Sequence, residues 1–138
     1  MLIHLKKNER LFINGAVIRM DRRGSIELLN DAHFLLENHV MQPEDATTPL
    51  RRLYFVAQTM LMDPTNASLT KYLFDTYVEQ IRQTIRNEYY LKFVNQLHES
   101  VSAGDYYDSL KQLRKNFKLD EPNISLADEQ ANINEKAA

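Results

Sequence analysis

The stretch RLFINGAVIRM at residues 10–20 determines how the first third of this chain folds. Two short runs of β-forming residues, 10–13 and 16–20, flank the dipeptide Asn14-Gly15. A type I′ turn requires a positive φ at both central residues, and Asn-Gly adopts that conformation at little cost. The stretch therefore predicts a β-hairpin.

Further short strands are expected on both sides of this hairpin. Turn-forming residues divide the first forty positions into apolar segments at 2–6, 10–13, 16–20, 25–29 and 33–37. In the hairpin, alternation places Leu11 and Ile13 on one face and Phe12 on the other. Because both faces carry apolar groups, we expect one face to meet helices and the other to meet a second subunit or another sheet.

A helical period replaces the alternation after residue 48. Thr48 followed by Pro49 is typical of a helix start, and Ser68 and Asp105 are expected to cap two further helices. Gly104 suits the left-handed position that ends a helix. Strands followed by helices predict an α+β fold: a small antiparallel N-terminal β-sheet of about five strands, then an antiparallel bundle of about four helices, over residues 49–62, 68–86, 89–103 and 105–117.

Aromatic side chains along these helices suggest two interpretations. Exposed aromatic rings can stack on the bases of single-stranded nucleic acid. Most of them recur at helical spacing, which favours packing in the core; in the second helix the expected buried stripe is Leu69, Tyr72, Leu73, Thr76, Tyr77, Ile81 and Ile85. Phe55, Phe74 and Tyr90 fall off the predicted stripes and remain candidates for stacking.

The overall composition is typical of one globular domain. The 138 residues are 43% hydrophobic and 26% charged. We expect a single domain over residues 1–118, with a β-rich basic part at 1–42 and a helical part at 48–118. Residues 119–138 hold five carboxylates against Lys136 and few apolar residues, which predicts a flexible acidic tail.

Composition also limits the cellular setting. Cysteine is absent, so disulfides and thiolate chemistry are excluded, in keeping with a reducing cytosol. No apolar run approaches the ~20 residues of a membrane span. We therefore expect a soluble, cytoplasmic protein with no membrane association.

Motifs for catalysis are missing from the sequence. With three glycines in all, the chain has no Gly-rich phosphate loop. His33 and His39 have no third ligand at a spacing typical of zinc sites, so surface or packing roles are favoured. We expect no enzyme, no catalytic residue, no metal site and no cofactor.

Cationic side chains dominate the first 24 residues, where six Lys and Arg residues stand against Glu9 and Asp21. Such asymmetry indicates an anionic partner, and a phosphate backbone is one candidate. Two further arginines occupy the first turn of the first helix, where cations oppose the helix dipole. The expected phosphate contacts are Lys6, Lys7, Arg10, Arg19, Arg22, Arg23, Arg51 and Arg52. Edge strands also carry Lys and Arg to discourage strand association, and this alternative stays open.

Several stretches together resemble the FlbT family of alphaproteobacterial flagellum assembly. They are FINGAVIR at 12–19, IELLND at 26–31, FLLE at 34–37, DATTP at 45–49 with RRLYF at 51–55, and AGDYY at 103–107. The resemblance spans about residues 2–117 in order. It implies a post-transcriptional regulator that associates with the 5′ leader of flagellin mRNA and alters its translation and stability, as a repressor or an activator.

Residues 1–13 are also similar to the first strands of CsrA, a translational regulator that dimerises by exchanging strands. This second resemblance implies a homodimer through the β-sheet and a basic RNA contact near Lys6. An alternative is a protein-interaction module whose helices hold flagellin or another flagellar assembly factor, so that the mRNA responds indirectly. A nuclease ranks third, because the scattered Asp and Glu residues lie chiefly at caps, turns and the tail.

Overall fold

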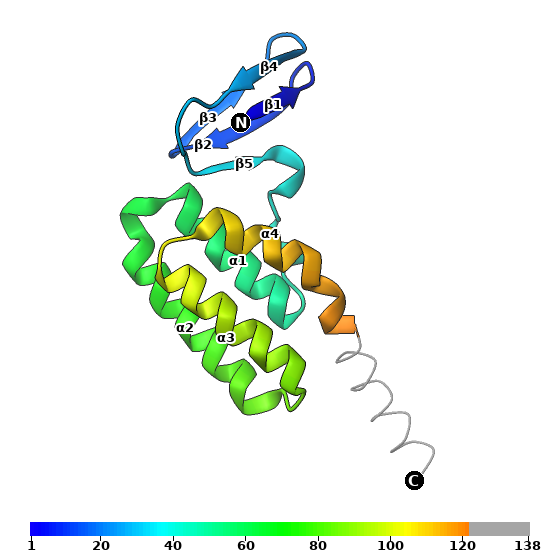
Figure 1. The fold of residues 1–138 in the computed structure, drawn as a ribbon, viewed down its shortest axis with the longest axis vertical. Helices are drawn as coiled ribbons and strands as arrows, with labels where there is room; N and C mark the ends of the chain where they lie inside the picture. Colours follow the sequence, from blue (N-terminus) through cyan, green and yellow to red (C-terminus); the bar gives the residue numbers. More distant parts are fainter. Residues whose placement is uncertain (122–138) are drawn as a thin grey trace.

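The strands lie above the helices in the computed structural model, which describes residues 1–121 (Figure 1). The strands are β1 (Leu2–Leu5), β2 (Arg10–Ile13), β3 (Ala16–Arg19), β4 (Gly24–Glu27) and β5 (Phe34–Leu36). They form two antiparallel sheets rather than the single sheet expected: β1 pairs with β4, and the second sheet has the order β3-β2-β5. The α+β class is confirmed.

A bulge explains why β1 does not continue into the sheet of β2. Met20 N–H donates to the Glu9 carbonyl at 3.0 Å, while the Met20 carbonyl accepts from Asn8 N–H at 2.7 Å. Asn8 and Glu9 therefore both lie opposite Met20, which makes this a β-bulge. Asn8 adopts a left-handed φ of 68°. Bulges bend a strand, so the chain leaves the plane of β2 at this point.

The hairpin around Asn14-Gly15 is confirmed. The two residues have φ values of 49° and 82°, as a type I′ turn requires. Ile13 pairs with Ala16 directly beside the turn, and Arg10 pairs with Arg19 at the other end of β2 and β3.

Both faces of β2 are covered, as expected. Leu11 is fully buried in a small cluster with Ile3, Leu5 and Phe34 between the two sheets, whereas Phe12 packs against the large core of the helices. One face therefore meets another sheet and the other face meets the helical body.

Four helices form the body beneath the sheets and run antiparallel to their neighbours (Figure 1). They are α1 (Pro49–Met62), α2 (Ala67–Thr84), α3 (Glu88–Ser102) and α4 (Tyr106–Asn116), with 3-10 turns at Glu37–His39, Pro43–Asp45, Pro64–Asn66 and Phe117–Leu119. No helix within residues 1–121 has the length and apolarity that crossing a membrane requires.

The helix caps were predicted in part. Thr48 caps α1, because its hydroxyl accepts Arg51 N–H, and Gly104 follows α3 with a φ of 85°. Ser68 is not a cap, since the turn at Pro64–Asn66 leads directly into α2 and places Asn66 at the N-cap. Asp105 occupies the N-cap of α4, but its side chain makes no capping hydrogen bond.

The buried face of α2 differs from the prediction. Phe74, Val78 and Ile81 are its buried residues, whereas Tyr72 is 77% exposed. Tyr90 of α3 is also fully buried. Phe74 and Tyr90 are therefore core residues, and interpreting them as base-stacking candidates was wrong.

The helical body extends beyond residue 118. Phe117–Leu119 form a 3-10 turn, and Asp120 is only 2% exposed. The predicted start of the acidic tail at residue 119 was therefore too early. The remainder of that expected segment, 122–138, lies outside the described residues.

Candidate nucleic-acid interface

Four of the predicted cations gather on two loops at the end of the sheets away from the helices (Figure 1). Lys6 and Lys7 lie in the loop between β1 and β2, and Arg22 and Arg23 lie in the loop between β3 and β4. All four side chains are exposed. We name this group of Lys6, Lys7, Arg22 and Arg23 the basic tip.

Backbone pairing holds the two loops of the basic tip together. Leu5 pairs with Gly24 at the ends of β1 and β4, and the bulge ties Asn8 and Glu9 to Met20. Residues separated by about fifteen positions in the sequence therefore become neighbours.

Few carboxylates compete for the cations of the basic tip. The Glu9 carboxylate accepts Lys6 N–H at 2.9 Å and so closes the first loop. Asp21 lies 3.8 Å from the Arg22 guanidinium, with both side chains more than 80% exposed, and such pairs contribute little. Within residues 1–121, Lys6, Lys7 and Arg23 form no ion pair.

Arg10 and Arg19 face each other across β2 and β3 beside the basic tip. Glu37 neutralises Arg10: its carboxylate accepts the Arg10 backbone N–H at 3.1 Å and the Arg10 Nε–H at 2.9 Å. These two hydrogen bonds, the backbone one first, lower the pKa of the Glu37 carboxyl. Both arginines are exposed, but within residues 1–121 only Arg10 has an ion-pair partner, so Arg19 is the uncompensated cation of the two.

Arg51 and Arg52 lie apart from the basic tip, at the start of α1. The other end of α1 is the one near the hairpin, where Leu61 and Met62 share a small cavity with residues 12–17. The Arg51 guanidinium lies 4.8 Å from the centre of the Phe117 ring, and Arg52 lines a cavity of about 240 Å³. The structure thus gathers six of the eight predicted cations at one end and places two elsewhere.

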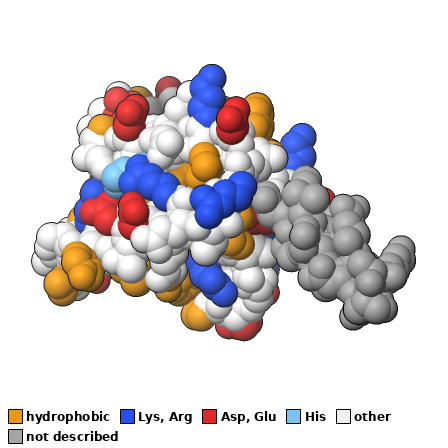
Figure 2. Space-filling model, turned by 90° about the horizontal axis from the view of Figure 1, so that it is seen from below, with side chains coloured by type: hydrophobic (Ala, Val, Ile, Leu, Met, Phe, Trp, Pro, Cys, Tyr) orange, Lys and Arg blue, Asp and Glu red, His pale blue; other side chains and the backbone are white. Residues whose placement is uncertain are grey.

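The end of the helical body opposite the sheets has mixed charge. Figure 2 shows Lys and Arg side chains there interspersed with Asp and Glu. Near the end of α2, Arg82 pairs with Glu79 at 3.4 Å. This surface therefore offers no field of a single sign to a polyanion.

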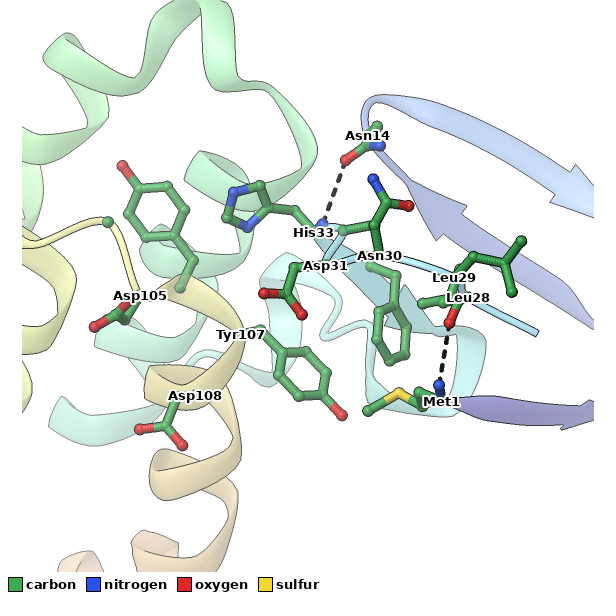
Figure 3. A pocket seen from close by; sticks show the side chains of 14 residues that line it. Met1, Asn14, Leu28, Leu29, Asn30, Asp31, His33, Asp105, Tyr107 and Asp108 are labelled. Carbon is green, nitrogen blue, oxygen red and sulfur yellow. Dashed lines mark hydrogen bonds between the residues drawn. The ribbon is translucent and has the colours of Figure 1, made fainter. Parts of the chain in front are cut away.

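A cavity of about 550 Å³ lies between the β4–β5 loop and the start of α4 (Figure 3). Asp31, Asp105 and Asp108 surround it, and its basic groups are the Met1 amine and His33. The amine donates to the Leu28 carbonyl at 3.1 Å. Three carboxylates disfavour a phosphate, so this cavity is distinct in chemistry from the basic tip. The sequence did not reveal it, because residues 28–34 and 104–108, which form most of its walls, are about seventy positions apart.

The two histidines considered as metal ligands have packing contacts. The His33 ring lies 6.0 Å from the Tyr106 ring, and the His39 carbonyl accepts the Tyr54 hydroxyl. Burial, followed by the nearby Arg114 guanidinium, lowers the pKa of His39. In the described part of the chain, no group of three His, Asp or Glu residues is arranged to hold a metal ion.

Comparison with known proteins gives a consistent family. The model of the family described as "Flagellar protein FlbT" matches residues 1–124. A protein of Chelativorans sp. (strain BNC1) named "Probable flagellum biosynthesis repressor protein FlbT" is 43% identical over 128 residues, which cover 93% of this chain and 88% of the relative. A protein of the same name from Rhizobium johnstonii is 45% identical over 119 residues, or 86% of this chain and 80% of the relative. No solved structure matches. This chain therefore belongs to the FlbT family.

Proposed function

We propose that this protein regulates flagellum biosynthesis after transcription, by binding the 5′ leader of flagellin mRNA through its basic tip and altering translation and stability of the message. The regulatory part of this proposal is supported by the names of the relatives, which are probable flagellum biosynthesis repressors. The RNA-binding part rests on one observation: two loops distant in sequence bring four exposed cations together. This role belongs in the cytoplasm, where messages are translated.

The chemistry of the basic tip suits a phosphate backbone. Lys and Arg side chains on exposed loops can follow the phosphates of a single strand, whereas sequence is read from the base edges. Arg19 extends the tip along β3, and Arg10, Arg51 and Arg52 are secondary contacts. If the four tip residues neutralise four phosphates, the logarithm of the affinity falls with the logarithm of salt with a slope of about −3.

Charge reversal at the tip tests this proposal. We expect Arg22→Glu with Arg23→Glu to weaken binding to a flagellin leader RNA about tenfold or more, because attraction becomes repulsion at two phosphate contacts. Binding is measured by fluorescence anisotropy at several salt concentrations. Lys111→Glu with Lys115→Glu on α4 is the matched control, since both lysines are exposed and the change in net charge is the same. Equal affinity of the tip variant and the control would contradict the assigned surface.

In this proposal the protein binds the message without cleaving it, and cellular nucleases carry out its decay. The leader RNA should remain intact when incubated with purified protein and magnesium. Shortened RNA would instead support a nuclease.

A second function, binding of flagellin or another flagellar assembly factor, is favoured by an apolar stripe on α2. Leu69, Tyr72 and Leu73 are 73%, 77% and 42% exposed and lie at the spacing of one helix face. Tyr72→Glu should then reduce capture of flagellin by RNase-treated protein. Tyr89→Glu is the matched control, because Tyr89 is 69% exposed on α3. Unchanged capture by the Tyr72 variant would contradict a role of this stripe in binding flagellin.

A further inference from the structure

Among residues 1–121, no strand pairs with the outer edge of β3. In this part of the chain β3 pairs with β2 alone, and all four of its residues are exposed. Val17 is 58% exposed and Ile18 is 37% exposed, so apolar side chains flank this edge. An open edge with apolar side chains is a template for another strand.

The ladder within the hairpin determines which backbone groups the edge offers. In a two-residue hairpin, the residues beside the turn exchange hydrogen bonds, and such pairs then alternate along the strands. Ile13–Ala16 and Leu11–Ile18 are therefore hydrogen-bonded pairs, whereas Phe12–Val17 is not. It follows that the N–H and C=O groups of Val17 and Arg19 point away from β2.

We propose that a second copy of this chain pairs with that edge, β3 against β3, antiparallel about a two-fold axis on which Ile18 faces Ile18. In this register Val17 of each copy exchanges hydrogen bonds with Arg19 of the other, so the outward groups of both residues are satisfied. The result is one six-stranded sheet with an isologous interface.

Side chains favour this register and a second copy as the occupant. Ile18 lies opposite Leu11, so its side chain is on the same face of the sheet as Leu11, a member of the apolar cluster between the sheets. Pairing Ile18 with Ile18 covers two apolar side chains that are 37% exposed in the single chain. The two Arg19 side chains then lie on opposite sides of the axis, each facing a valine rather than the other arginine.

A competing symmetric register sets Val17 against Val17 and loses this apolar pair. Ile18 would face Ala16, and Arg19 would face Gly15. Both registers use the outward backbone groups of Val17 and Arg19, but the second register pairs Arg19 with a turn residue, so it is the poorer in side-chain contacts. Since each strand contributes four residues, the association is weak and concentration-dependent, and a covalent trap is the appropriate measurement.

The lack of cysteine in the chain makes that trap unambiguous. Residues at a non-hydrogen-bonded antiparallel pair have Cα atoms about 4.5 Å apart, within the range of a disulfide. Ile18→Cys should therefore form a disulfide-linked dimer under mild oxidation. In the same register the two Val17 Cα atoms are about 8 Å apart, too far for a disulfide, so Val17→Cys should not cross-link.

Ser102→Cys on α3 measures collisional cross-linking, because Ser102 is exposed and belongs to a helix rather than to a strand edge. We expect Ile18→Cys to exceed it about tenfold or more in initial rate, since paired thiols have a millimolar effective concentration. Adding Val17→Pro removes one outward N–H without touching the ladder to β2 and should return the rate to that of the control. Circular dichroism verifies that each variant is folded.

Three results would overturn the proposal: an Ile18→Cys rate equal to that of Ser102→Cys, preferential cross-linking of Val17→Cys, or a rate that Val17→Pro does not change. The experiment contains no RNA, so its failure would leave the RNA-binding proposal standing. If both hold, antiparallel pairing sets the two basic tips at opposite ends of the joined sheet.

Discussion

Asp120 links three segments of the chain through one side chain. Its carboxylate accepts the Leu50 backbone N–H at 3.1 Å and the Tyr90 hydroxyl at 2.6 Å, and the residue is 2% exposed. Leu50 lies in the first turn of α1, where a negative charge is favourable to the helix dipole. Burial, and then the Asp120 carboxylate, raises the pKa of Tyr90 far above its usual value, so its hydroxyl stays a donor.

We predict that Asp120→Ala destabilises the protein by about 2–4 kcal/mol, because a buried hydroxyl and a helix N–H lose their acceptor. Urea denaturation followed by circular dichroism measures the change. Glu121→Ala is the matched control, since Glu121 is exposed and carries the same charge. A loss no greater than that of the control would show that Asp120 adds nothing to stability.

His39 gives the folded state a dependence on pH. Its pKa is lowered on folding, so the unfolded chain binds a proton more readily and stability falls as the pH drops below about 6.5. His39→Gln should make the free energy of unfolding less sensitive to pH between about pH 7 and pH 5.5, with the backbone bond to Tyr54 kept. Identical pH profiles for the variant and the wild type would contradict this.

At the scale of the element, the strongest local signals predicted the structure correctly, whereas the cap at Ser68 and the buried face of α2 were predicted wrongly. Asn14-Gly15 and Thr48-Pro49 act within a few residues, so the hairpin and the start of α1 could be predicted. The sequence of α2 carries apolar residues on two faces, and periodicity alone cannot tell which one is covered. Contacts of α2 with α1 and α3 select the face of Phe74 and leave Tyr72 exposed.

The turn of the hairpin should be sensitive to substitution through the backbone alone. We predict that Gly15→Ala lowers the free energy of unfolding by about 1–2 kcal/mol, because a φ of +82° is unfavourable for alanine. The added Cβ meets no atom within 4 Å, so the loss comes from the backbone conformation and not from a clash. Gly24→Ala is the comparison: it has no positive φ, and its Cβ would meet only the flexible end of Met20 at 3.3 Å. Chemical denaturation should show the larger loss for Gly15; the reverse order would place the strain elsewhere.

At the scale of the whole molecule, β5 joins the sheets to the helical body. Phe34 belongs to the cluster between the sheets, and the next residue, Leu35, belongs to the core of the helices. Phe34 also packs on Tyr107 of α4, with ring centres 4.7 Å apart. Successive side chains of one strand thus connect the two apolar clusters.

We predict that Leu35→Ala costs about 2–5 kcal/mol and separates the two parts in hydrogen exchange. In the wild type, amides of β1 and of α1 should open with similar free energies, whereas in the variant those of β1 should exchange first. Leu5→Ala, which acts inside the sheet cluster, is the comparison. Equal protection of both parts in Leu35→Ala would show that another contact couples them.

The candidate site could be predicted as a list of residues but not as a surface. Lys6 and Arg23 become neighbours only through the pairing of β1 with β4, which no local pattern specifies. For the same reason, only the tertiary structure shows that Arg51 lies apart from the basic tip and that Arg10 pairs with Glu37.

The bond between Leu50 and Asp120 also bears on when the protein can finish folding. A chain emerging from the ribosome presents α1 long before the residue that completes its first turn has been synthesised, since seventy positions separate the two. Until residue 120 has been synthesised, the Leu50 amide and the Tyr90 hydroxyl lack this acceptor, so this part of the stability is gained only after all four helices have been made.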